Sequence, residues 1–193
     1  MLKVIMKILL TFFVLFFSSL LRAEDISDFQ IEGMSIGDSA LDYFSEEEIK
    51  NNLQNYYNDK TYLVTEIEFI SSFKVYDAIQ LHFKSLDKNY TIESITGFLD
   101  YENNINECYD QKNEIYNDIA SLFKNMKNDK YDFPHNADKS KKSIVSVSEF
   151  FDDDFVIRVS CTDWTKQMGY MDTLQVSIDK TDFLDWVENS AYK

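Results

Sequence analysis

The sequence predicts an α+β fold, with one antiparallel sheet of about six strands and helices packed on one face. Runs of alternating apolar and polar residues come in two groups of three, which predicts the strands. Between the groups lies a long segment with apolar residues every three or four positions, which predicts a helix. Shorter helical segments precede the first group and follow the second. The expected order is αα-βββ-α-βββ-α, in a single domain over residues 24–193, because no repeat or linker interrupts them.

The first 23 residues have the pattern of a signal peptide. Residues 1–7 include two lysines, residues 8–21 are uncharged and mostly apolar, and Ala23 provides a small residue at the cut. The apolar stretch is shorter than the about 20 residues that cross a bilayer. We therefore expect cleavage after Ala23 and a periplasmic or secreted protein that does not span the membrane.

The chain is strongly acidic, with a formal net charge of −15. Loss of residues 1–23 would remove Lys3, Lys7 and Arg22 but no acidic residue, so the mature chain would be more negative still. This charge repels phosphate groups. We therefore expect no nucleic-acid partner, and we interpret the acidic residues mainly as a solvated surface that keeps the protein soluble.

A capping box with a hydrophobic staple marks the clearest helix start. Ser45 can accept a hydrogen bond from the amide of Glu48 while the Glu48 side chain reaches back to the Ser45 amide. Phe44 can pack against Ile49 across the same cap. Apolar residues continue at helical spacing, which predicts a helix from Ser45 to about Asp59.

A turn flanked by glycines precedes this helix. The segment Gly33–Leu41 reads GMSIGDSAL and leads into a shorter predicted helix over residues 38–44. It resembles the turn and short helix that open the SmpA/OmlA outer-membrane assembly lipoproteins and the related β-lactamase-inhibitor-like modules. The resemblance implies two helices before an antiparallel sheet in an exported binding module. No cysteine precedes Cys108, so the lipid-bearing cysteine of such lipoproteins is absent and a soluble product is expected.

Six strands follow from the alternating runs. They are residues 63–69, 75–83 and 95–101 in the first group, and Ile144–Phe151, Phe155–Asp163 and Tyr170–Asp179 in the second. Residues 86–89 read LDKN, and short polar residues such as Asp87 and Asn89 tolerate turn dihedrals, which favours a hairpin turn. Residues 125–142 are polar, contain the only proline and are expected to form a mobile loop.

Two further helices complete the prediction. The long one is expected from Asn103 to Met126, with one apolar stripe that faces the core. The last is expected over Thr181–Ser190, with Asp179 as its cap. Its buried residues should be Phe183, Leu184 and Val187.

The two histidines do not indicate a catalytic set. His82 lies on the strand face opposite Ile79 and Leu81, so we expect it to point at solvent or at a shallow polar surface. His135 follows Pro134 in the expected loop, where nothing would hold it at the geometry that general-base catalysis needs. The sequence therefore singles out no catalytic residue.

Metal and cofactor signatures are also missing from the sequence. Asp152–Asp154 lacks the spaced ligands and central glycine of a calcium loop, and consecutive aspartates are typical of a hairpin tip. The cysteines and histidines lack the close spacing of a zinc site. Four glycines are too few for a glycine-rich phosphate loop. We expect no metal and no cofactor, although the many acidic residues leave a pair of catalytic carboxylates open.

Cys108 and Cys161 are expected to form a disulfide between the long helix and the sheet. Cys108 lies on the apolar stripe of the helix, and Cys161 alternates in register with Ile157 and Val159. Both sulfurs should therefore face the same core. Two cysteines in an exported chain allow one intramolecular pairing. Two buried free thiols and a redox-active pair remain the alternatives.

These observations lead to a hypothesis about function. We expect an exported, non-catalytic binding or envelope-assembly module whose partner is a protein or an envelope component. The alternatives are an exported hydrolase with an acidic active site and a carrier of a small apolar ligand. A cleft with two or more carboxylates would favour the hydrolase, and a closed apolar cavity would favour the carrier. A flat aromatic patch would favour the binding module.

Overall fold

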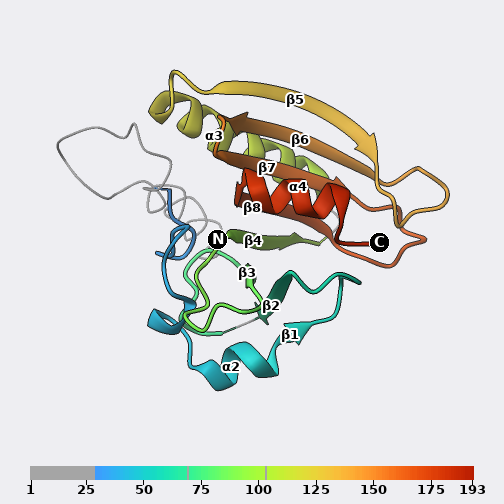
Figure 1. The fold of residues 1–193 in the computed structure, drawn as a ribbon. Coiled ribbons are helices and arrows are strands. Elements are labelled where there is room, and N and C mark those ends of the chain that lie inside the picture. Colours follow the sequence, from blue (N-terminus) through green and yellow to red (C-terminus); the bar gives the residue numbers. More distant parts are fainter. Residues whose placement is uncertain (1–28, 69, 103) are drawn as a thin grey trace.

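The computed structural model describes residues 29–68, 70–102 and 104–193. The predicted signal peptide over residues 1–23 lies outside this part of the chain, as do Phe69 and Asn103. The described residues form an α+β fold around one antiparallel sheet (Figure 1).

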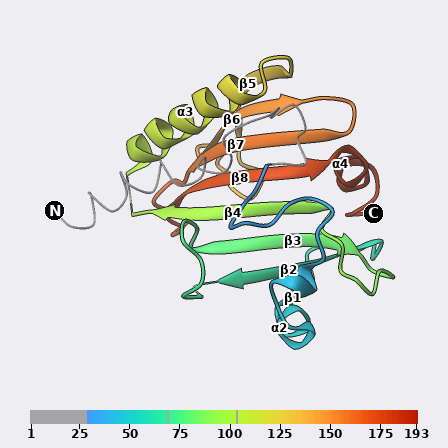
Figure 2. The ribbon, with the colours of Figure 1, turned by 90° about the vertical axis from the view of Figure 1, so that its left-hand side faces the viewer.

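The sheet has eight strands in the order β1-β2-β3-β4-β8-β7-β6-β5 (Figure 2). Their bounds are β1 Leu53–Gln54, β2 Tyr62–Glu68, β3 Ala78–Lys84, β4 Ser94–Tyr101, β5 Lys127–Pro134, β6 Ile144–Phe151, β7 Phe155–Asp163 and β8 Asp172–Lys180. All neighbouring strands are antiparallel. The six predicted strands correspond to β2, β3, β4, β6, β7 and β8. The expected number of about six was wrong because β1 and β5 join the two edges.

Strand β5 replaces most of the predicted mobile loop. It pairs with β6 along its whole length, from Lys127 opposite Phe151 to Pro134 opposite Ile144. All eight of its residues are exposed, so polar and charged side chains are tolerated on both of its faces. The apolar alternation that marks a half-buried strand is therefore absent, and the sequence pattern indicated a loop.

The helices are shorter than predicted near the N-terminus. The capping box of Ser45 and Glu48 is confirmed, and it starts α2 (Glu46–Asn51). This helix ends well before Asp59 because Leu53 and Gln54 pair with β2 instead of continuing the helical hydrogen bonds. The helix expected over residues 38–44 is a single 3-10 turn, η2 (Ala40–Asp42). The predicted helix order is therefore wrong at this end of the chain.

The two remaining helices lie on opposite faces of the sheet. They are α3 (Ile105–Leu122) and α4 (Thr181–Asn189), and Figure 1 shows α4 in front of the sheet and α3 behind it. The expectation that all helices cover one face was wrong. Phe183 and Trp186 of α4 pack with Tyr62 in a cluster separate from the main core. We call the two sides of the sheet the α3 face and the α4 face.

The main core fills the α3 face. Strand alternation sends Leu174, Val176 and Ile178 of β8 to this face, beside Ile157, Val159 and Cys161 of β7. Cys108 and Cys161 are both fully buried, and their Cα atoms are 6.0 Å apart. This separation is within the range of disulfides. The structure thus places them as a disulfide-capable pair that joins α3 to β7.

Candidate functional site

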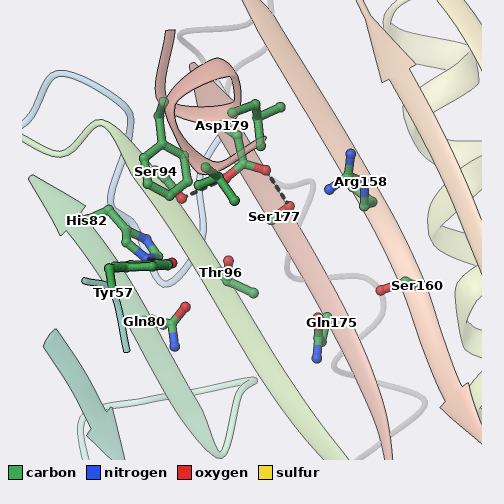
Figure 3. A pocket seen from close by; sticks show the side chains of 13 residues that line it. Tyr57, Gln80, His82, Ser94, Thr96, Arg158, Ser160, Gln175, Ser177 and Asp179 are labelled. Atoms are coloured by element: carbon green, nitrogen blue, oxygen red, sulfur yellow. Dashed lines mark hydrogen bonds between the residues drawn. The ribbon is translucent and has the colours of Figure 1, made fainter. Parts of the chain in front are cut away.

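A polar pocket lies between α4 and the sheet, on the face opposite α3 (Figure 3). Its volume is about 180 Å³. Strands β3, β4, β8 and β7 supply a polar floor made of Gln80, His82, Ser94, Thr96, Arg158, Ser160, Gln175, Ser177 and Asp179. An apolar rim consists of Tyr57 and the α4 residues Phe183, Leu184 and Val187.

Strand register arranges the polar floor in rows. The first row is His82, Ser94 and Asp179, the second is Gln80, Thr96, Ser177 and Arg158, and the third contains Gln175 and Ser160. Side chains alternate between faces along a strand, so each strand that fills the core with one set of residues presents the other set here. Polar residues at every second position of β8 were a visible signal in the sequence. Nothing in the sequence showed that four strands bring such residues together.

The chain between β1 and β2 closes one side of the pocket. The backbone N–H of Asn58 donates to the carbonyl oxygen of Ala191, with a distance of 2.8 Å. This contact ties the segment to the end of α4. The ring of Tyr57 lies 4.9 Å from that of Trp186 and 5.4 Å from that of Tyr192, measured between centroids. Tyr57 is thereby held at the pocket rim, close to His82.

Asp179 is a buried carboxylate in the floor. Its side chain accepts hydrogen bonds from the hydroxyls of Ser94 at 2.6 Å and Ser177 at 2.8 Å. Burial raises the pKa of Asp179, and the two serines and the charge of Arg158 oppose this only in part. The predicted cap of the last helix was wrong: Lys180 is the N-cap of α4, without a side-chain hydrogen bond. Strand alternation directs Asp179 into the pocket instead.

The raised pKa of Asp179 predicts that the protein loses stability as this carboxyl group ionises. The folded state favours the protonated acid, so stability should fall as pH rises from the ordinary carboxyl pKa of 3.8 to the raised value. Asp179→Asn removes this titration but keeps an oxygen that accepts from the serines. As pH rises through this window, we expect Asp179→Asn to become more stable than the parent. Above the window, the difference in stability should stay constant. Urea unfolding of both proteins over a pH series tests this; a gain that appears only on acidification would contradict it.

His82 is buried in the pocket wall, with 3% of its surface exposed. Its Nε2 lies 3.0 Å from the hydroxyl of Tyr57, and its ring lies 4.4 Å from that of Phe183. Desolvation lowers its pKa to about 3, so the imidazole is neutral at neutral pH. Of the two predicted surroundings, solvent was wrong because Tyr57 and α4 cover this part of the sheet, whereas His82 does face a polar surface. Nδ1 is buried and has no hydrogen-bond partner among the described residues.

Arg158 is the cation of the floor. Its Nε and Nη2 lie 3.3 and 3.2 Å from Oε2 of Glu149 on the neighbouring strand β6. Burial acts against its charge, but Asp179, Tyr131 and Glu149 outweigh burial and raise the pKa of Arg158. The guanidinium is therefore charged and already has a carboxylate partner.

Three floor side chains have no hydrogen-bond partner in the part of the chain that the structure describes. Thr96, Ser160 and Gln175 form no side-chain hydrogen bond with any other described residue. Thr96 and Ser160 are nearly inaccessible to bulk solvent, with 9% and 4% of their surfaces exposed. Buried polar groups are normally hydrogen-bonded. The pocket thus presents hydroxyl and amide groups that a ligand can engage.

The first row contains the residue types of a hydrolytic triad but not its connections. In a triad, histidine lies between serine and the carboxylate and hydrogen-bonds to both. Here Ser94 donates directly to Asp179, and among the described residues the His82 ring nitrogens have Tyr57 as their one hydrogen-bond partner. Ser94 is also fully buried. This row supplies no activated nucleophile in the described geometry.

His135 lies far along the sheet from this pocket, just after β5. Its backbone N–H donates to the carbonyl oxygen of Ser143 at 2.8 Å, and its ring lies 4.2 Å from that of Trp164. His135 is therefore held in place rather than carried on a mobile loop, and the structure does not bring it together with His82.

The aspartate run forms a turn between β6 and β7. Oδ1 of Asp152 accepts from the backbone N–H groups of Asp154 and Phe155 at 2.9 and 2.8 Å. This arrangement agrees with the predicted hairpin tip. In the described part of the chain, no group of three or more His, Cys, Asp or Glu residues is arranged to hold a metal ion.

Neither the family models, the curated proteins nor the solved structures yielded a match to this chain. The resemblance of residues 33–41 to the outer-membrane assembly lipoproteins thus gains no support. Over residues 29–68, 70–102 and 104–193, no helix has the length and apolar character needed to cross a bilayer.

Proposed function

We propose that this protein is an exported, non-catalytic binding module whose pocket takes a small, neutral, hydroxyl-rich molecule, such as one sugar unit of an envelope component. The observation that carries the proposal is the set of partnerless side chains, Thr96, Ser160 and Gln175, in a pocket of about 180 Å³. A hydroxyl both donates and accepts, so a polyol suits hydroxyl and amide partners equally.

The charges of the pocket favour a neutral ligand. Arg158 is paired with Glu149, and the Asp179 carboxylate is held by two serine hydroxyls. The neutral imidazole of His82 adds no charge. An ionic ligand would have to compete with these existing partners and lose its own hydration in the pocket. The negative net charge of the chain further disfavours an anion.

The apolar rim suits the carbon face of a sugar. Tyr57, Phe183, Leu184 and Val187 lie along the α4 side of the pocket, opposite the polar floor. A ligand with polar groups on one side and C–H groups on the other would bury both surfaces favourably. A wholly apolar ligand would leave the polar floor desolvated without partners, which is unfavourable.

An acidic hydrolytic site receives less support from this geometry. Among the residues that the structure describes, Asp179 is the one carboxylate that lines the pocket. Hydrolysis of a glycosidic bond ordinarily uses two carboxyl groups on either side of the bond. Binding without turnover is therefore the function that this pocket supports best.

Thr96→Val provides a matched test of the pocket. Valine has nearly the same shape as threonine but lacks the hydroxyl, so one ligand hydrogen bond worth about 1 kcal/mol should be lost. We expect about fivefold weaker binding of a neutral sugar, with unchanged stability. Isothermal titration with glucose, N-acetylglucosamine, glucosamine and glucuronate checks this, and the neutral sugars should bind better than the two charged ones.

Thr162→Val is the control. Thr162 lies on the same sheet face and is 3% exposed, but it does not line the pocket. Its replacement should leave sugar binding unchanged. Equal losses in both variants, or preferred binding of a charged sugar, would contradict the proposal. Release of a cleaved product from a disaccharide would show that the site is catalytic.

A further inference from the structure

Strand β5 forms a long, open edge of the sheet (Figure 1). It pairs with β6 on one side, and no other described strand pairs with its outer side. All of its residues, Lys127–Pro134, are exposed. An exposed edge of this length presents unpaired N–H and C=O groups to another strand.

An aromatic surface runs along the same edge. Tyr131 and Phe133 are stacked with ring centroids 6.1 Å apart, and they are 37% and 40% exposed. Both lie on the α4 face of β5, since Tyr131 is opposite Val147 and Phe133 is opposite Val145. Just after β5, the ring of His135 lies 4.2 Å from that of Trp164, which in turn lies 4.8 Å from that of Tyr170. Aromatic side chains at an exposed edge favour an interface.

The charges of β5 are self-complementary. Lys127, Lys130, Asp129 and Asp132 give the strand no net charge, whereas the whole chain carries −15. Lys130 and Asp132 both lie on the α3 face, and Nζ of Lys130 is 3.3 Å from the centroid of the Tyr116 ring. Asp132 forms no salt bridge within the described part of the chain.

Symmetry restricts how β5 could pair with a second copy of itself. Residues directly opposite each other in an antiparallel pair lie on the same face of the sheet, so a two-fold axis passes between two copies of one residue. The longest pairing, over seven residues of each strand, is obtained only with the axis at Lys130 or at Tyr131. The first places Lys130 against its own copy. The second places Lys130 opposite Asp132 of the second copy, and does so twice.

We propose that two copies of this protein pair through β5, about a two-fold axis at Tyr131, to form one continuous sheet. Each Lys130 then faces Asp132 of the second copy on the α3 face, and Phe133 faces Asp129 of the second copy on the α4 face. Helix α3 packs mainly over β7, β8 and β4, and its Tyr116 also contacts Asn128 and Lys130 on the α3 face of β5. The polar pocket under α4 stays open, because β6 and β5 lie between it and the interface.

Cross-linking tests the register of this dimer. With Tyr131→Cys, the two introduced thiols lie opposite each other at the axis, and mild oxidation should produce a covalent dimer on a non-reducing gel. Phe133→Cys is the matched control. Its two copies would be four residues apart along the strands, or about 14 Å, which is too far for a disulfide. Equal cross-linking of both variants would overturn the proposed register.

Charge exchange tests the pairing itself by sedimentation. Lys130→Asp places like charges opposite each other twice, and should weaken dimerisation about tenfold. Lys130→Asp combined with Asp132→Lys restores both opposite-charge pairs and should recover dimerisation to within about threefold. Because β5 is fully exposed, melting curves should show that all variants fold. A parent that stays monomeric without a Tyr131→Cys cross-link would overturn the proposal, and would mean that Lys130 and Pro134 keep the edge unpaired.

Discussion

Replacing both cysteines with alanine should lower the free energy of unfolding by about 4 kcal/mol. Cys108 and Cys161 are 53 residues apart, so their bond closes a long loop in the unfolded chain. Removing it returns conformational freedom to the unfolded state. Chemical denaturation of the parent and of the Cys108→Ala/Cys161→Ala variant measures the difference.

Reduction of the parent provides the control for this experiment. Both cysteines are fully buried on the α3 face, so alanine also removes some packing. The parent with a reductant should therefore lose most, but not all, of the stability that the variant loses. Thiol counting on denatured, unreduced protein should find no free thiol. Two free thiols in material taken from the cell envelope would contradict the expected bridge and would weaken the case for export.

Gly97→Ala should lower the free energy of unfolding by about 2 to 3 kcal/mol through overpacking. Gly97 lies in the middle of β4, opposite Ile79 and Val176 on the α3 face. An added Cβ would lie 2.6 Å from Cγ and Cδ1 of the Tyr76 ring. That ring is 8% exposed and packed in the core, so it has little room to move. Thermal or urea unfolding measures the cost.

A double-mutant cycle identifies the cause. If the clash with Tyr76 sets the cost, Gly97→Ala should be much less costly in a Tyr76→Leu background, where the ring is gone. Gly169→Ala is the control because nothing lies within 4 Å of its added Cβ, although its φ of +72° disfavours alanine. Its cost of about 1 kcal/mol should not depend on Tyr76. An equal cost of Gly97→Ala in both backgrounds would exclude the clash.

Local signals in the sequence predicted the elements whose causes are local. The capping box at Ser45 depends on residues three positions apart, and the structure contains it. Strands β6 and β7 have the predicted bounds, Ile144–Phe151 and Phe155–Asp163. The stripe of α3 placed Cys108 toward the same core as Cys161. Each of these features depends on residues close together in the sequence, within a single helix or strand.

Pairing between distant segments decided the rest. Leu53 and Gln54 continue a helical pattern, but hydrogen bonds to β2 made them a strand. Lys127–Pro134 has no buried face, and pairing with β6 makes it a strand.

The pocket depended on tertiary structure in the same way. Asp179 could have capped a helix, and His82 could have faced solvent. Both line the pocket because β3, β4 and β8 lie side by side, and α4 crosses the face that the long helix leaves uncovered. By itself the sequence determined the fold class, the main strands and the shared core of the two cysteines. Strand order, the position of α4 and the pocket depend on contacts between residues far apart in the sequence. The periodicity of side chains along a single helix or strand does not reveal such contacts.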